Sequence, residues 1–82
     1  MDDAALDSAL RAVVAEVFSI PADAVVDELS PDVLAAWDSF GHVRLVSALE
    51  ERFGITLDAP DAMSMFNVGA IREILINRGV SP

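Results

Sequence analysis

The sequence predicts an all-α protein, a small up-down helical bundle of three long helices and one short helix, with a long loop between helices 1 and 2. Apolar residues recur at three- and four-residue steps in three segments, and no segment shows the alternation that is typical of a strand. Residues that favour helix ends flank these segments. The chain has 82 residues, enough for one small domain, so we expect residues 1–82 to form a single unit.

The first helix is expected from about Asp3 to Ser19, an alanine-rich segment with high helix propensity. Its predicted apolar stripe consists of Leu6, Leu10, Val13, Val14 and Val17. The helix should stop before Pro21, because proline disfavours helical backbone at the residue before it. The helical pattern of apolar residues is then broken as far as Trp37. A domain of this size tolerates so long a connection only if part of it packs on the core. The candidate anchors are Val25, Leu29, Leu34 and Trp37, and we interpret Trp37 as a lid over the core rather than a partner contact.

The second long helix is expected between Asp38 and Gly54. Asp38 suits the N-cap, because its carboxylate can accept hydrogen bonds from the first turn, and Gly54 suits the residue that closes the last turn. The predicted buried face consists of Val46, Leu49 and Phe53, flanked by Val43 and Leu45. Ser39 would then lie at the exposed N-terminal tip, where backbone donors and the helix macrodipole favour an anion such as phosphate.

A short helix of one or two turns is expected to begin at Asp58 or Pro60. Asn67 then caps a last helix from Val68 to about Arg78, whose inward residues would be Val68, Ile71, Ile74 and Leu75. Residues 80–82 are expected to fray. A soft apolar cluster, which we assign to the core, consists of Met63, Met65 and Phe66.

The composition restricts the function classes. A net charge of -9, from 14 acidic and 5 basic residues, disfavours nucleic acid and anionic membranes and favours basic protein surfaces as partners. Without cysteine the chain has no disulfide framework and no thiolate nucleophile. The acidic N-terminus does not suit a signal peptide, and no apolar run approaches the roughly 20 residues that span a bilayer. We therefore expect a soluble, cytoplasmic monomer that is too small for a conventional enzyme active site.

The sequence does not favour three other kinds of chemical site. Ser39 and His42 are three residues apart and could form a nucleophile–base pair. The sequence offers no evident third group to orient the imidazole and no evident oxyanion hole, so we expect His42 at the surface or facing a partner. We also expect no metal site, because the acids lack calcium-loop spacing, and the chain has no glycine-rich phosphate loop.

The segment from Trp37 to Ile55 resembles the phosphopantetheine-bearing helix of acyl carrier proteins. The mark of that family is an Asp-Ser-Leu tripeptide at the start of the second helix, followed by a V-x-L-V-x-x-L-E-x-x-F pattern and a glycine. Here the tripeptide is Asp38-Ser39-Phe40, and the pattern continues with Val43, Leu45, Val46, Leu49, Glu50, Phe53 and Gly54. Phe40 replaces the usual leucine; it is bulkier and still apolar, so we expect altered partner fit with an intact attachment site. The length and the order of elements resemble a free-standing carrier.

The resemblance implies that a phosphopantetheinyl transferase attaches 4'-phosphopantetheine to Ser39, and that Asp38 helps the transferase to hold its magnesium. The thiol of this arm would carry an acyl chain as a thioester. An acyltransferase, ligase or ketosynthase would then dock through a basic surface. The residues expected at these contacts are Phe40, Arg44, Glu50, Glu51, Asp58 and Asp61, although many relatives have an acid in place of Arg44. An alternative for Glu50 and Glu51 is a solvated face with local pairing to Arg44 or Arg52.

The cargo stays open between acyl intermediates and aminoacyl groups. The absence of lysine, the richness in alanine and valine, and the unusual Phe40 and Arg44 favour a polyketide or related secondary-metabolite pathway. A free-standing aminoacyl or peptidyl carrier is the alternative. If an acyl chain folded back between the helices, Phe40, Val43, Met63, Met65 and Phe66 would line its pocket. A function of a different class, an unmodified helical module that binds a basic partner, would not depend on Ser39.

Overall fold

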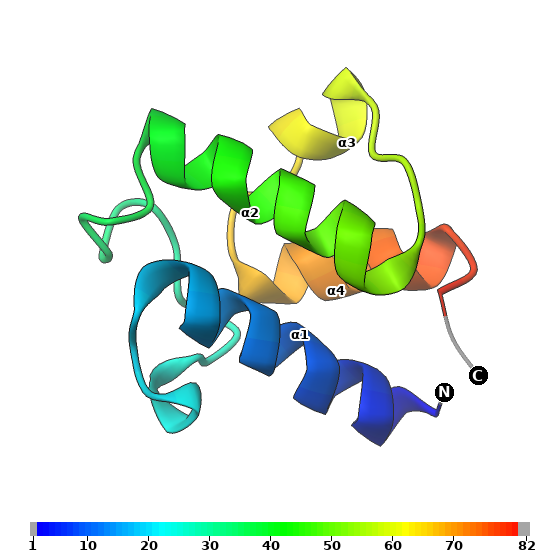
Figure 1. Ribbon diagram of the computed structural model, residues 1–82, viewed down its shortest axis with the longest axis horizontal. Helices are drawn as coiled ribbons and strands as arrows, with labels where there is room; N and C mark the ends of the chain where they lie inside the picture. Colours follow the sequence, from blue (N-terminus) through cyan, green and yellow to red (C-terminus); the bar gives the residue numbers. More distant parts are fainter. Residues whose placement is uncertain (1, 81–82) are drawn as a thin grey trace.

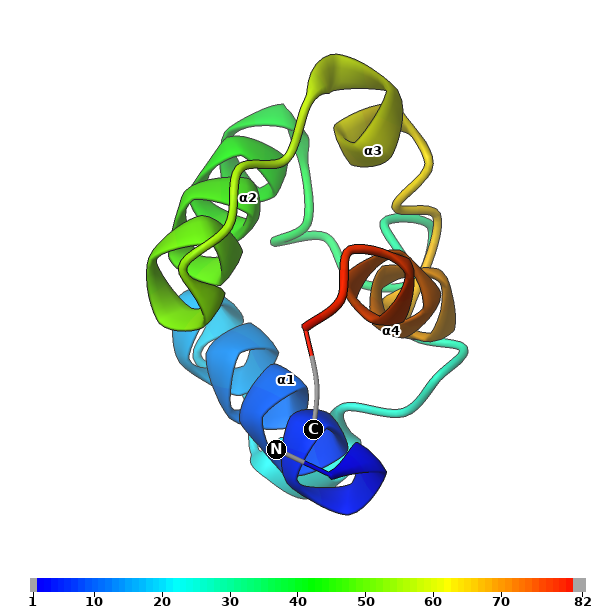
Figure 2. The same cartoon turned by 90° about the vertical axis from the view of Figure 1, so that its right-hand side faces the viewer.

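The computed structural model describes residues 2–80, which form five helical segments and no strand (Figure 1). These segments are α1 (Asp3–Phe18), the 3₁₀ turn η1 (Ala22–Ala24), α2 (Ser39–Phe53), α3 (Ala59–Met63) and α4 (Val68–Asn77). Helices α1 and α2 run antiparallel and side by side, α4 lies across the core from them, and α3 lies at the edge between α2 and α4 (Figure 1, Figure 2). The predicted fold class, with three long helices, one short helix and a long first connection, is confirmed.

The helix ends follow the local chemistry of the sequence. The Asp38 carboxylate accepts a hydrogen bond from the Gly41 N–H at 2.8 Å, and Gly54 closes α2 in the left-handed conformation with φ 64°. Asp58 and Asn67 cap α3 and α4 in the same way, through the N–H groups three residues later. The predicted N-caps are therefore confirmed.

The core is apolar throughout the described residues, with no buried polar or charged side chain. It is formed by one cluster of side chains from α1, α2, α4 and the connections: Leu6, Leu10, Val13, Val14, Phe18, Val25, Trp37, Leu45, Leu49, Leu57, Met65, Val68, Ile71, Leu75 and Val80. Trp37 is 2% exposed and stacks on Phe18 with ring centroids 5.6 Å apart. The prediction that Trp37 covers the core is confirmed.

The long connection between α1 and α2 is tied to α4. Carbonyl oxygens of Asp27 and Leu29 accept from the N–H groups of Gly69 and Val68, which satisfies the start of α4. Arg72 of α4 donates to both Asp7 of α1 and Asp27 of the connection. The predicted anchors Val25, Leu29, Leu34 and Trp37 all pack on the core, the first and last of them buried and the other two half-buried. These contacts explain how so long a loop remains ordered.

The predicted buried face of α2 was correct for Leu45 and Leu49 and wrong for Val43. Leu45 and Leu49 are fully buried, and the buried Gly41 lies four residues before Leu45, so the buried row of this helix follows steps of four residues. Val46 and Phe53 only pack at the margin of the core, and Val43 is 64% exposed. Several apolar rows run along this helix, and packing against α1 decides which of them is buried.

Two further expectations were wrong. Met65 is buried, but Met63 and Phe66 are 76% and 69% exposed. Met63 belongs to α3, a single short helix that buries none of its own residues, and Phe66 lies in the segment after it. Val80 does not fray: it is buried, and its N–H donates to the Leu75 carbonyl oxygen at 3.0 Å. The rest of the segment expected to fray, residues 81 and 82, lies outside the described residues.

Candidate functional site

Ser39 is exposed and is the first residue of α2. The first intrahelical hydrogen bond of this helix runs from the His42 N–H to the Asp38 carbonyl oxygen, and the Asp38 side chain satisfies the Gly41 N–H. The N–H groups of Ser39 and Phe40 come before these bonds and point out of the helix tip. An exposed hydroxyl beside two backbone donors at the positive end of a helix fits a phosphate ester on that oxygen.

Gly41 brings the preceding loop against the first turn of α2. A Cβ atom at this position would lie within 3.0 Å of the Ala36 carbonyl oxygen and 2.9 Å from Phe18 Cε1. Real Cβ atoms do not approach other atoms this closely, so a residue without a side chain is required for the loop and α1 to pack here. Atoms of Ala36 and Phe18 therefore pack closely against the first turn of α2 and hold the backbone near Ser39 in place.

His42 is part of the fold and is not the surface residue that we expected. Trp37 Nε1 donates to His42 Nδ1 at 3.0 Å, and His42 Nε2 lies 2.9 Å from the Ala62 carbonyl oxygen. Because Nδ1 is the acceptor, the neutral ring carries its hydrogen on Nε2 and donates it to Ala62. Both nitrogens are thus occupied, which argues against His42 as a base for Ser39.

Large apolar side chains lie exposed on the two elements that the His42–Ala62 bond joins. Phe40 directly follows Ser39 and is 83% exposed. We call these side chains the apolar rim: Phe40 and Val43 of α2, Met63 of α3 and Phe66 just after it. Exposed apolar side chains of this size on two elements that contact each other are typical of surfaces that meet a partner. The sequence signal for two of them, Met63 and Phe66, was misread as core.

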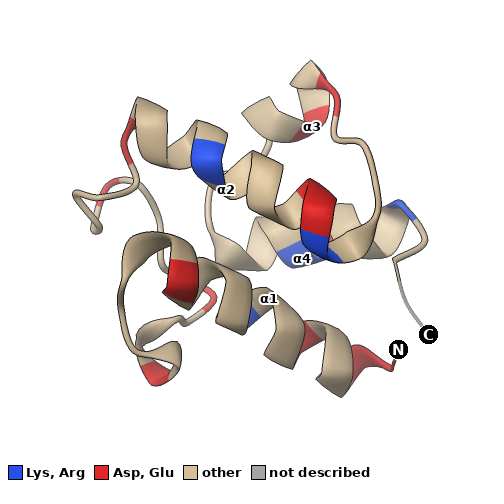
Figure 3. Cartoon of the chain, in the orientation of Figure 1, with Lys and Arg blue, Asp and Glu red and all other residues tan. Residues whose placement is uncertain are grey.

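The acids that we expected at partner contacts mostly have partners within the chain. Glu50 Oε2 accepts from the Leu57 N–H at 2.8 Å, which fixes the loop after α2. Asp58 lies 3.3 Å from Arg78, and Asp61 accepts from the same guanidinium at 2.7 Å. The hydrogen bond from Arg78 lowers the pKa of Asp61 despite the opposing effect of burial. In Figure 3, acidic residues lie on α1, α2, α3 and the long loop, and arginines lie on α1, α2 and α4.

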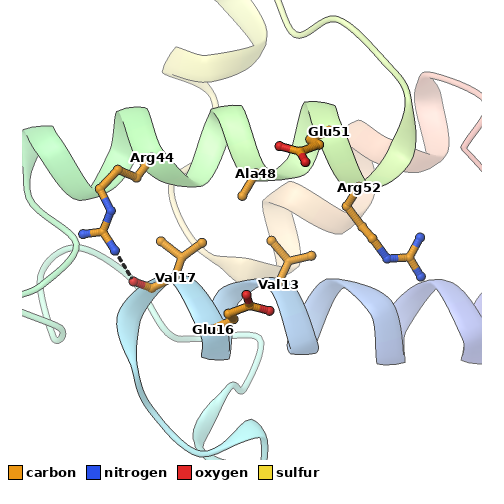
Figure 4. A pocket seen from close by; sticks show the side chains of 7 residues that line it. All are labelled: Val13, Glu16, Val17, Arg44, Ala48, Glu51 and Arg52. Atoms are coloured by element: carbon orange, nitrogen blue, oxygen red, sulfur yellow. Dashed lines mark hydrogen bonds between the residues drawn. The ribbon is translucent and has the colours of Figure 1, made fainter.

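Glu51 and Arg44 face a shallow groove of about 590 Å³ between α1 and α2, which the sequence did not reveal (Figure 4). It is lined by Val13, Glu16, Val17, Arg44, Ala48, Glu51 and Arg52. Arg44 donates to the Val17 carbonyl oxygen at the end of α1, where a cation complements the helix macrodipole. Arg44 therefore links the two long helices, in addition to any role toward a partner.

Comparison with known proteins agrees with this geometry. A family model described as "Phosphopantetheine attachment site" matches residues 8–75, a range that includes all of α2 and most of α1 and α4. A search of curated proteins found no match. Among residues 2–80, no helix is both long and apolar enough to cross a membrane.

Proposed function

Since the chain belongs to the phosphopantetheine-attachment family, whose members carry 4'-phosphopantetheine as a covalent group, we propose that Ser39 is the residue that bears it here. The observation that carries this proposal is the exposed Ser39 hydroxyl at the capped tip of α2. A phosphate ester on this oxygen would be stabilised by the helix terminus by about 0.3–1 kcal/mol. Asp38 uses Oδ1 for the cap, which leaves Oδ2 for the magnesium that the transferase brings.

The group supplies a terminal thiol that holds an acyl chain as a thioester, a function that a chain without cysteine cannot provide itself. The residues of this protein hold and present that arm. Ser39 is the anchor, and the close packing at Gly41 keeps the anchor in place. We propose that the chain itself performs no catalysis, because His42, the one histidine, has both ring nitrogens engaged.

Partner enzymes would dock on α2 and α3 around Ser39. Phe40 is the largest exposed apolar side chain beside the anchor, and it would fill an apolar depression on the partner. Glu51 is exposed and can meet a basic residue, whereas a partner arginine at Asp58 or Asp61 would have to compete with Arg78. We keep as proposed contacts Phe40, Arg44, Glu50, Glu51, Asp58 and Asp61. The apolar Phe40 should contribute most, because the charged side chains other than Glu51 also have contacts within the chain.

The partners of such a carrier are a phosphopantetheinyl transferase and biosynthetic enzymes. We place the protein in a polyketide or related secondary-metabolite pathway, on the strength of its unusual Phe40 and Arg44 and its lack of lysine. An aminoacyl or peptidyl carrier is the second candidate. Incubation of the modified protein with acyl-activating and aminoacyl-activating ligases would separate the two, by the mass of the group that is loaded.

The central test is the intact mass of the protein after incubation with coenzyme A, magnesium and a broad-specificity phosphopantetheinyl transferase. We expect wild type to gain one phosphopantetheinyl group and Ser39→Ala to gain none. Ser47→Ala, at a second exposed serine of α2, is the matched control and should be modified like wild type. Ser39→Ala should stay folded, because the cap is formed by Asp38.

If neither wild type nor Ser39→Ala gains mass under conditions that modify another carrier, the proposal is wrong. The unmodified interaction module would then be the better hypothesis. That module predicts loss of binding to a basic partner on charge reversal at Glu50 and Glu51, with no effect of Ser39→Ala.

A further inference from the structure

Helix α3 has few attachments to the rest of the molecule. None of its five residues is buried, and its anchors are the flanking core residues Leu57 and Met65. Beyond these, Arg78 binds Asp58 and Asp61 near its start, and His42 binds the Ala62 carbonyl oxygen. The His42 bond is therefore a direct link between α3 and the helix that begins at Ser39. An element held by so few contacts has a low local stability.

The two hydrogen bonds of His42 require one protonation state of its ring. The indole N–H of Trp37 cannot accept a hydrogen bond, so Nδ1 of His42 must be free of hydrogen. The Ala62 carbonyl oxygen cannot donate, so Nε2 must carry the hydrogen. A second proton, taken from solvent, could bind only at Nδ1. It would then face the Trp37 N–H, and two donors would stand 3.0 Å apart.

We propose that His42 is a positioning residue that acts as a latch: its neutral ring holds α3 and the α3 side of the apolar rim beside the attachment site, and protonation at Nδ1 releases them. The ring would have to turn away from Trp37, which breaks the Ala62 bond as well. This inference rests on the proposed function, because it is the attachment site at Ser39 that makes the position of α3 matter. Its consequence is that partner docking would depend on pH.

The charged groups around the latch have partners of their own. On α2 the carboxylate of Asp38 accepts from Gly41, and Arg44 donates to Val17. On α3 the carboxylates of Asp58 and Asp61 bind Arg78 of the segment after α4. The loop contributes the indole of Trp37, which does not titrate. No ion pair of His42 is formed among residues 2–80, so the charge of the ring is not held by a neighbouring carboxylate.

The experiment uses the unmodified protein and two NMR readouts. The ¹⁵N shifts of the imidazole at about pH 7.5 should report the tautomer with hydrogen on Nε2. Amide exchange then measures the protection of Ala62 and Ser64, whose N–H groups bond to Asp58 and Pro60 within α3. The same ¹⁵N shifts, followed as the pH is lowered, give the second pH value, at which the ring carries both hydrogens. Protection factors at these amides should be about fivefold lower at that pH than at about pH 7.5, the loss expected for one hydrogen bond. The buried Val68 amide, bonded to Leu29, is the control and should not change.

Two variants of His42 distinguish the effects of its hydrogen bonds to Trp37 and Ala62. In His42→Gln the amide nitrogen can take the place of Nε2 and donate to Ala62, so α3 should keep its protection at both pH values. In His42→Asn the amide oxygen takes the place of Nδ1 and accepts from Trp37, but the side chain is too short for Ala62. Protection at Ala62 and Ser64 should then be about fivefold lower at both pH values. Neither side chain titrates, so both variants should lose the pH response.

The latch is overturned by a tautomer with hydrogen on Nδ1, by equal α3 protection of wild type at both pH values, or by a His42→Asn variant that exchanges like wild type. If a variant loses protection at Val68 as well, it has unfolded. The proposal is then judged from wild type alone, by the tautomer of its ring and by its α3 protection at the two pH values. None of these readouts involves the modification of Ser39. A failed latch therefore leaves the mass test of the proposed function standing, and a failed mass test leaves the exchange data unaffected.

Discussion

Gly41→Ala should destabilise the protein, although helix propensity alone predicts the opposite. Alanine is about 1 kcal/mol more favourable than glycine inside a helix. At this position the added Cβ would lie within 3.0 Å of a backbone oxygen of Ala36 and 2.9 Å from the Phe18 ring, so both must move. Overpacking costs about 1–3 kcal/mol, and the upper part of this range, about 2–3 kcal/mol, applies here because the closest atom belongs to the loop backbone and not to a flexible side chain. We expect a net loss of about 1–2 kcal/mol.

The assay is urea and thermal unfolding followed by the fluorescence of Trp37, the one tryptophan of the chain. This reporter lies against Phe18, where the strain would act. For a domain of this size, each kcal/mol lowers the melting temperature by about 4–8 °C. Gly69→Ala is the matched control. It places the same methyl group near the start of another helix, with ordinary contacts of 3.4 Å or more, so it should be neutral or stabilising by up to about 1 kcal/mol.

Stability changes of opposite sign in Gly41→Ala and Gly69→Ala would support the close packing of the loop on α2. The reasoning would be refuted if Gly41→Ala were as stable as wild type or more stable. In that case the approach of Ala36 to α2 would be looser than the structure shows. The position of Ser39 would then depend on the helix cap alone.

Two more changes test other contacts. Glu50→Ala should lower the free energy of unfolding by about 1–2 kcal/mol, because the Leu57 N–H loses its acceptor. Glu50→Gln keeps an acceptor and should cost less than about 0.5 kcal/mol. Equal urea midpoints for the two variants would contradict this structural role of Glu50. Burial opposes the ionisation of Asp7, but hydrogen bonds from Arg72 and Arg11 outweigh it and keep its pKa below the usual value. Ionised Asp7 therefore contributes stability that is complete above the unfolded-state pKa of about 3.9 and is lost as the pH falls through the lower folded-state pKa. Arg72→Met should lower stability at neutral pH and weaken the decline of stability in acid, measured by urea unfolding at several pH values. The control is Arg52→Met, which removes a guanidinium that lies over the Phe53 ring and should leave the pH dependence of stability as in wild type. Parallel plots of stability against pH for Arg72→Met and wild type would count against the Arg72 contacts.

Much of the candidate site could be predicted because its signals are local. A carboxylate three residues before a free N–H forms a cap in almost any fold, and this placed Asp38 and Ser39 at the tip of α2. The glycine that ends α2 acts through its own backbone conformation. The family resemblance rests on the same short stretch, and the match over residues 8–75 confirmed it. The assignment of the arm to Ser39 stays a prediction until it is tested.

The errors all concern the choice between surface and core. The sequence offers α2 more apolar residues than one face can bury, so Val43 and Leu45 look alike until α1 and α4 are in place. Met63 and Phe66 look like core because they are large and apolar, but the short α3 buries none of its residues and Phe66 lies exposed in the segment after it. Val80 looks like a frayed end, yet it fills the space beside the end of α4.

The sequence by itself determined the helices, their ends and the exposed serine, because these depend on residues within one or two turns of each other. Only the tertiary structure decided what the polar side chains do. Arg72 meets Asp7 across 65 residues, Arg44 meets Val17 across 27, and His42 meets Ala62 across 20. Such pairs have no fixed spacing, since they form only when the packing of an apolar core brings distant segments together. The same packing turns an apparent surface histidine into the link between α2 and α3.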